Sequence, residues 1–293
     1  AVKGGAIYND GKTTVTGSTF TNNSADASAG EDKNGGAIYN GGNLTVSSTK
    51  FDKNSVNDNG GAIYVAENTT TEITNSSFTN NTAYKGGALY ITKGTRQNEG
   101  TGSIETVVPV VNISKATFTN NSATDGGAIY VGQDSSVTIT DSNFTNNIAT
   151  NKGGAIYMDK NSTVTINALK TNVTFSGNKA GDNSNSIYMD NNSTLNLIAN
   201  NKRKITIKDN IETKDATAKI DITTVDSGKV NIINENALKD LHVTIRRNSL
   251  ISTQNSRIAT TAFKSLEVNG TSRVSIDASL KSGQADKIQA ETV

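Results

Sequence analysis

The chain has 293 residues, of which 33% are hydrophobic and 5% aromatic, and its formal net charge is +1. Low hydrophobicity is typical of disordered proteins, but those usually also carry a high net charge. The near-neutral charge gives no reason to expect nucleic acid or an anionic membrane as a partner. The absence of cysteine excludes disulfide bonds and cysteine-ligated metals. These values favour an elongated solenoid, in which each repeat buries only a few side chains.

Two short motifs alternate along the first two thirds of the chain. A Gly-Gly-Ala-Ile/Leu-Tyr pentapeptide starts at Gly4, Gly35, Gly60, Gly86, Gly126 and Gly153, with a worn copy, Ser-Asn-Ser-Ile-Tyr, at Ser184. A Phe-x-x-Asn motif lies between successive pentapeptides, at Phe20/Asn23, Phe51/Asn54, Phe78/Asn81, Phe118/Asn121, Phe144/Asn147 and Phe175/Asn178. Tandem repetition of this length predicts a solenoid.

A short segment of alternating apolar and polar residues precedes each phenylalanine, as in Thr13 to Thr16 and Ser136 to Thr140. A period of two predicts a half-buried strand. The last apolar residue of the segment lies five positions before the phenylalanine, as Val15 does before Phe20. A straight strand would place two residues at this odd spacing on opposite faces. Since both should point inward, the chain is predicted to bend between them.

One repeat therefore corresponds to one coil of a three-sided solenoid, and the chain is predicted to be all-β, a right-handed single-stranded parallel β-helix. The right-handed sense follows from the strong preference of parallel crossover connections. Stacked coils should line up like residues, with apolar columns inside, an asparagine column at a corner and a structural tyrosine column. Asparagine suits a stacked corner because its amide both donates and accepts hydrogen bonds and because it tolerates left-handed backbone angles. The paired glycines predict a tight bend where a Cβ atom would clash.

The longest step between pentapeptides arises from an insertion at residues 92–109, from Thr92 to Pro109. Solenoids accept insertions as protruding loops, often on the binding face. The segment is therefore expected to be either a tolerated decoration or a loop that contacts a partner. Long loops are uncommon unless they are functional or disordered, so contact with a partner remains an open hypothesis for this segment.

The organisation along the chain changes near residue 190. Residues 1–190 are predicted to form the coils that carry both motifs, and residues 191–293 to form degenerate coils of the same solenoid. The second part keeps alternating segments such as Lys219 to Ile222. Residues 237–240 could form a short helical turn. The least regular stretch, Ser249 to Lys264, is predicted to be a loop.

The interleaved motifs, over about Gly4 to Asp190, resemble the repeat of the chlamydial-type polymorphic outer-membrane proteins, which are autotransporters. The resemblance implies the β-helical passenger of a bacterial surface protein, acting outside the cell as an adhesin or structural stalk. It also implies outer-membrane anchoring through a membrane β-barrel in the full-length protein, which this sequence lacks. A host or neighbouring-cell surface protein or glycan is the implied partner, with residues 92–109 as a candidate contact. The cysteines common in chlamydial members are absent here. Exposed end coils would offer unpaired strands for self-association.

Parallel β-helices also include polysaccharide lyases and hydrolases, so an extracellular polysaccharide-degrading enzyme is the alternative function. Glycoside hydrolysis needs two carboxylates that flank the bond. The acidic residues are scattered and mostly occupy predicted turns, as do Asp26, Asp32, Asp125 and Asp141. His242 is the single histidine, and the chain has no cysteine. The sequence therefore indicates no metal site and no catalytic triad around His242. The sequence therefore predicts no enzyme and no catalytic, cofactor-binding or metal-binding residues. The enzyme alternative requires three or more carboxylates, with a lysine or arginine, on one outward face of adjacent coils.

Overall fold

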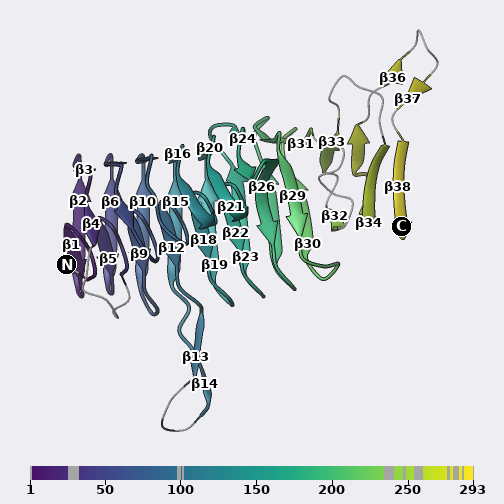
Figure 1. The fold of residues 1–293 in the computed structure, drawn as a ribbon. Coiled ribbons are helices and arrows are strands. Elements are labelled where there is room, and N and C mark those ends of the chain that lie inside the picture. The colour runs from purple at the N-terminus through teal and green to yellow at the C-terminus, as the bar shows by residue number, and fades with distance from the viewer. Residues whose placement is uncertain are drawn as a thin grey trace.

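The computed structural model describes residues 2–25, 33–97, 100, 102–233, 241–246, 249–253, 260–275, 278–279, 284–285 and 287–292. Within these residues the chain forms strands and turns and no helix. Figure 1 shows the strands stacked side by side along one axis, with the N-terminal and C-terminal strands at opposite ends. Almost all pairings between successive coils are parallel, and three long sheets form the three sides. The predicted three-sided parallel β-solenoid is thereby confirmed, while its right-handed sense stays a prediction.

The first side is called the tyrosine sheet, because it contains the tyrosine of each pentapeptide. Its strands are β1 (Ile7–Asn9), β5 (Ile38–Asn40), β9 (Ile63–Val65), β12 (Leu89–Ile91), β18 (Ile129–Val131), β22 (Ile156–Met158), β26 (Asn183–Met189) and β29 (Asn210–Thr213). Beside it run the short strands β4 (Ser24–Ala25), β8 (Ser55–Val56), β17 (Ser122–Asp125), β21 (Ile148–Lys152) and β25 (Lys179–Ala180).

The second side is called the threonine sheet, because threonine recurs on its outward face. Its strands are β2 (Lys12–Thr16), β6 (Asn43–Ser47), β10 (Thr70–Thr74), β15 (Val110–Ser114), β19 (Ser136–Thr140), β23 (Thr163–Ala168), β27 (Thr194–Ala199), β30 (Lys219–Thr224), β32 (His242–Arg246), β34 (Thr260–Val268) and β38 (Lys287–Thr292).

The third side is called the phenylalanine sheet. Its strands are β3 (Thr19–Thr21), β7 (Lys50–Asp52), β11 (Ser77–Thr79), β16 (Thr117–Thr119), β20 (Asn143–Thr145), β24 (Val173–Ser176), β28 (Lys204–Ile207), β31 (Lys229–Ile232), β33 (Leu250–Ser252) and β35 (Arg273–Ser275). Two antiparallel hairpins stand outside the three sides, formed by β13 (Thr95–Gln97) with β14 (Ile104–Thr106) and by β36 (Ala278–Ser279) with β37 (Gln284–Ala285).

Identical residues lie above each other inside the solenoid, as predicted. Ile38, Ile63 and Leu89 are fully buried in one column of the tyrosine sheet. The phenylalanines stack face to face, with centroids 4.8 Å apart between Phe51 and Phe78. Each coil thus buries only a few side chains, and the columns join into one continuous core. Since the apolar residues are shared along a rod, a low apolar content is enough for a folded chain.

Two corners of each of the first five coils have left-handed backbone angles. The bend predicted between the threonine and phenylalanine sheets occurs two residues after the last buried apolar residue, with φ of 58° at Gly17 and 50° at Asn75. The next corner has φ of 55° at Asn22 and 56° at Asn80. The left-handed residue therefore lies one position before the stacked asparagine, not at it. The side-chain ladder and the backbone turn are thus divided between neighbouring residues.

The paired glycines answer two different steric demands. The first of each pair has a positive φ, 65° at Gly4, which an L-residue adopts only with strain. The second has an ordinary φ, but a Cβ atom on Gly36 would clash with the carbonyl oxygen of Gly61 in the next coil. The predicted close approach of the backbone is therefore present between coils.

Two predictions concerned irregular segments. The structure corrects one of them, and the other falls on residues that the structure does not describe. The stretch from Ser249 to Lys264 is not a loop throughout, because it contains β33 and the first residues of β34. Both strands pair with the preceding coil, so the coils continue where the sequence motifs are lost. The helical turn expected at residues 237–240 lies outside the described residues. Strand β27 pairs with β23 and with β30, and the division at residue 190 stays a prediction.

Candidate functional site

The insertion forms a β-hairpin that projects from the rod (Figure 1). Strands β13 and β14 pair in antiparallel fashion, with Thr95 opposite Thr106. The hairpin is fixed at its base, because the Thr95 hydroxyl donates to Asp134 Oδ2 at 2.8 Å and the Gly94 N–H donates to the Gln133 carbonyl at 2.7 Å. The protrusion expected at residues 92–109 is confirmed.

Asp134, which lies in the coil after the hairpin, also contacts the next coil along the rod. Asp134 Oδ1 accepts from Asn161 Nδ2 at 2.8 Å, and its Oδ2 accepts from Thr95 and from Gln133. Burial raises the pKa of Asp134, but these three hydrogen bonds outweigh burial and hold the pKa below its usual value. The hairpin therefore leaves the rod from a charged and fully hydrogen-bonded anchor.

The second strand of the hairpin and the residues after it present apolar side chains to solvent. Ile104 is 70% exposed, Val108 36% and Val110 51%. Val107 and Val111, which alternate with them, are buried. The three exposed residues lie close together along the chain, with Ile104 in β14, Val110 at the start of β15 and Val108 in the segment that joins the two strands. Clustered exposed apolar side chains typically mark a contact surface. These three exposed residues, Ile104, Val108 and Val110, are called the hairpin stripe.

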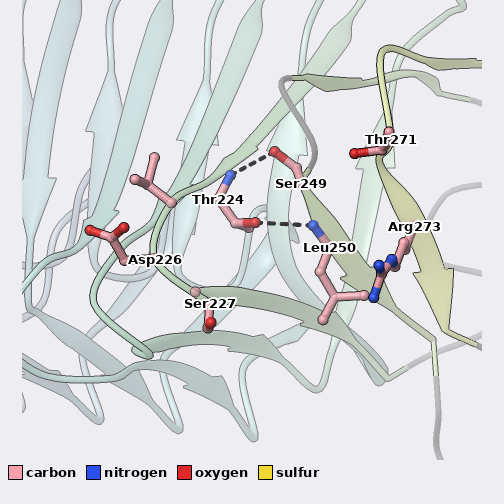
Figure 2. Close-up of a pocket in the computed structure, with 9 residues that line it drawn as sticks. Thr224, Asp226, Ser227, Ser249, Leu250, Thr271 and Arg273 are labelled. Atoms are coloured by element: carbon pink, nitrogen blue, oxygen red, sulfur yellow. Dashed lines mark hydrogen bonds between the residues drawn. The ribbon is translucent and has the colours of Figure 1, made fainter.

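A hollow of about 470 Å³ lies at the corner between the threonine and phenylalanine sheets near the C-terminal end. Figure 2 shows Asp226 and Arg273 on opposite sides of it, with Thr224, Ser249 and Leu250 between them. The hydroxyls at its centre are already used, because the Thr224 N–H donates to Ser249 Oγ at 2.7 Å and the Leu250 N–H donates to Thr224 Oγ1 at 3.0 Å. These contacts join two coils, so we interpret the hollow as a structural corner between them.

The tyrosines form an outward column whose ring faces cover one another. Neighbouring rings from Tyr8 to Tyr188 have centroids 4.8 to 5.2 Å apart and nearly parallel planes. Sugar rings bind to the faces of aromatic rings, but stacked tyrosines offer mainly their edges. Burial and the neighbouring Tyr64 and Tyr8 hydroxyls raise the pKa of Tyr39 to about 12. The predicted structural tyrosine column is confirmed.

The asparagines of the Phe-x-x-Asn motif form a buried amide ladder. Each side-chain amide donates to the Oδ1 of the next, as Asn81 does to Asn121 at 2.9 Å. From Asn54 onward, each also donates to a phenylalanine carbonyl of the preceding coil, as Asn121 does to Phe78 at 3.0 Å. The ladder ends at Asp209, which sequence reasoning missed because the coil that contains it has lost the motif. The asparagines thus have a structural role in joining successive coils.

Of the acidic residues singled out in the sequence, the two that the structure describes make separate contacts. Asp125, the last residue of β17, accepts from Asn151 of β21 at 2.8 Å. Asp141 accepts from the backbone N–H groups of residues 169–171, which fixes a longer turn in the next coil. Asp26 and Asp32 lie outside the described residues. Among the residues that the structure describes, no group of three or more histidine and acidic side chains could hold a metal ion.

The single histidine lies on the outward face of the threonine sheet. His242 is half-buried in β32, and its Nδ1 lies 2.5 Å from Ser265 Oγ in the neighbouring strand. Asp221 and Glu267 occupy the same face of the adjacent strands β30 and β34. The enzyme alternative requires three or more carboxylates on one face, and among the described residues this face brings together two.

Five segments of the chain match the Chlamydia polymorphic membrane protein (Chlamydia_PMP) repeat, at residues 17–41, 48–66, 75–92, 115–132 and 141–159. The chain carries polymorphic membrane protein repeats. Each matched segment starts at the bend after a threonine-sheet strand and ends at a tyrosine-sheet strand. Each polymorphic membrane protein repeat thus contains one strand of the phenylalanine sheet, one asparagine of the amide ladder and one glycine pair. The sixth coil, with Phe175 and the worn copy at Ser184, lies outside the matched segments.

Comparison with curated proteins and comparison with solved structures each gave no match. Within the described residues, no helix is of the length and apolar character that crossing a lipid bilayer requires.

Proposed function

We propose that this chain is the exposed rod of a bacterial surface protein, displayed outside the cell with an outer-membrane anchor in the full-length protein, and that it acts as an adhesin or stalk. The repeats support the surface location, since they belong to polymorphic membrane proteins. The single observation that carries the adhesive role is the projecting hairpin, which leaves the rod from a fixed base and exposes an apolar stripe.

The rod is well suited to hold such a contact away from a cell surface. Its coils are joined by continuous backbone pairing, by the asparagine ladder and by stacked phenylalanines. A rod of this kind does not need a deep core, and its length grows by about 4.8 Å with each coil. The hairpin stripe is then the contact surface for a protein or glycan on a host or neighbouring cell.

The adhesive role is tested by coating beads with the chain and counting the beads that bind to cultured host cells or to bacteria. The variant Ile104→Lys/Val110→Lys places charges on the hairpin stripe and should abolish most of the binding. Ile148 is 45% exposed on β21, away from the hairpin, so Ile148→Lys is the matched control and should bind as the parent chain does. Binding that survives the double variant, or no binding to any cell type, would refute the adhesive role of the hairpin.

The enzyme alternative is tested on the same protein. The chain is incubated with soluble polysaccharides, and the reaction is followed by the appearance of reducing ends and of unsaturated products. If the chain is an adhesin and not an enzyme, neither reducing ends nor unsaturated products should appear. Product formation that disappears in Asp221→Asn would favour the enzyme hypothesis over the adhesin hypothesis.

A further inference from the structure

A polar cleft lies over the threonine sheet at its C-terminal end, and its volume is about 640 Å³. This size falls within the range of about 300–1,000 Å³ that is typical of small-molecule sites. Its floor is the outward face of β30, β32 and β34, which pair side by side in register. Its wall is the turn around Thr217, together with Asn192. The cleft is separate from the hairpin, which leaves the rod between β12 and β15.

The floor carries two rows of hydrogen-bonding side chains. One row consists of Lys219, His242 and Ser265, and the other of Asp221, Thr244 and Glu267. Neighbours within a row lie on adjacent strands, about 4.8 Å apart, and the two rows are about 6.7 Å apart along the strands. Because the sheet pairing sets these spacings, the floor presents a regular array of donors and acceptors.

The charged groups of the floor are held in place by one another. Arg246 Nη2 donates to both carboxylate oxygens of Asp221, at 3.1 Å each. The Thr244 hydroxyl donates to Glu267 Oε2 at 3.3 Å, and Asn269 Nδ2 donates to Glu267 Oε1 at 3.0 Å. These side chains are still partly open to solvent, so their remaining hydrogen-bonding capacity faces the cleft. The array is therefore preorganised before any ligand binds.

The wall is fixed as firmly as the floor. The Asn192 N–H donates to Thr217 Oγ1 at 2.8 Å, and both the N–H and the hydroxyl of Thr217 donate to Asp215 Oδ1, at 2.9 and 2.6 Å. The hydrogen bonds from Thr217 hold the pKa of Asp215 below its usual value. The turn therefore stands as a rigid rim beside the floor.

The chemistry of the cleft selects a class of ligand. Of the described residues that line it, Ala216 alone is apolar. A lipid, a nucleobase or an apolar peptide would therefore gain little there. The charges of Lys219 and Arg246 balance those of Asp221 and Glu267, so a strongly charged ligand gains little either. Hydroxyl groups both donate and accept, and so match a mixed array of charged donors and acceptors.

We infer that this cleft binds a neutral oligosaccharide, which lies across β30, β32 and β34 and is held by hydrogen bonds to Asp221, Arg246 and Glu267. The sugar is bound without an aromatic platform, so each site is weak and a surface that displays many chains gains strength through multivalency. This site goes beyond the proposed hairpin contact and does not depend on it.

The test measures binding of cellohexaose, maltohexaose and chitohexaose to the whole chain by calorimetry, with hexagalacturonate as the anionic comparison. At least one neutral sugar should bind, and more tightly than hexagalacturonate. Asp221→Asn and Glu267→Gln keep side-chain size and remove one charge each, and each should weaken binding about tenfold. Asp226→Asn, in the neighbouring hollow of Figure 2, is the matched control and should bind as the parent does. Unchanged unfolding midpoints would show that the variants fold.

Several results would overturn the inference. These are the absence of binding to all three neutral sugars, tighter binding of hexagalacturonate, or equal affinity in Asp221→Asn and Glu267→Gln. Loss of sugar binding only in Ile104→Lys/Val110→Lys would place the glycan at the hairpin, which removes the cleft as a site and keeps the adhesin. The opposite result is that the chain binds sugar in the cleft but that beads coated with it bind to no cell. This result would support the cleft inference and refute the proposed adhesive function.

Discussion

Asp209 stands at the end of the asparagine ladder and accepts hydrogen bonds from both the backbone N–H and the side-chain amide of Asn178, each at 3.0 Å. Gly177, Ser184 and Ser186 also donate to its two carboxylate oxygens. A ladder of amides has a direction, because each asparagine donates towards the next coil. A carboxylate, which only accepts, suits the last rung.

Replacing that last rung with an amide should destabilise the rod. In Asp209→Asn, the new NH₂ group must face donors on either side, which leaves buried groups unsatisfied. We expect a loss of about 1–3 kcal/mol in the free energy of unfolding, measured with urea. Asp226→Asn, at an exposed turn, should leave the stability unchanged. Equal stability of Asp209→Asn and the parent would contradict the role of Asp209 as the ladder end.

A second ladder of hydroxyls runs along the corner between the threonine and phenylalanine sheets and is broken at Ala116. The Thr49 N–H donates to Ser76 Oγ at 3.2 Å, and the Ala116 N–H donates to Ser142 Oγ at 3.0 Å. At the broken rung, Ala116 offers the Ser76 N–H no side-chain acceptor. Ala116→Thr should supply one and raise the free energy of unfolding by about 0.5–1.5 kcal/mol over the isosteric Ala116→Val. Val matching or exceeding Thr would refute the hydroxyl ladder.

The tyrosine column predicts a loss of stability at alkaline pH. Burial and neighbouring groups raise the pKa of Tyr39 from 10.0 to about 12, and burial also raises those of Tyr90 and Tyr157. The unfolded chain thus releases these protons first, so the stabilisation is complete below about pH 10 and is lost as pH rises through the folded pKa. Urea unfolding and tyrosinate absorbance should both show this loss.

The control for the alkaline effect keeps the stack and removes the titration. Tyr39→Phe combined with Tyr90→Phe and Tyr157→Phe preserves the aromatic rings, so this variant should lose less stability between pH about 10 and about 12 than the parent. An identical pH dependence in parent and variant would mean that other groups cause the alkaline unfolding.

The close approach between coils predicts opposite outcomes for two glycines. Gly36→Ala places a Cβ against the carbonyl oxygen of Gly61 and 2.6 Å from that of Ser55, both of which are backbone atoms that cannot move independently. It should cost about 3 kcal/mol or prevent folding. Gly11→Ala meets nothing within 4 Å and should change stability by less than about 0.5 kcal/mol. A well-folded Gly36→Ala with the stability of the parent would contradict the coil packing.

Much of the site was beyond sequence reasoning for a physical reason. The cleft joins His242 to Ser265 and Arg246 to Asp221, which are 23 and 25 residues apart along the chain. Their meeting depends on the register of degenerate coils, where no motif marks the position of each strand. The base of the hairpin likewise depends on Asp134, which lies in the following coil and shares no local pattern with Thr95.

The sequence by itself determined the solenoid, its three sides and the columns of isoleucine, phenylalanine and tyrosine, because a repeated pattern must place like residues at like positions in every coil. It also located the insertion that leaves the rod. Only the tertiary structure decided that this insertion is a hairpin with an apolar stripe, that Asp209 closes the asparagine ladder and that β33 continues the coils past Ser249. Those features arise from contacts between neighbouring coils, and such contacts follow from pairing register and burial, which one strand's residues do not specify.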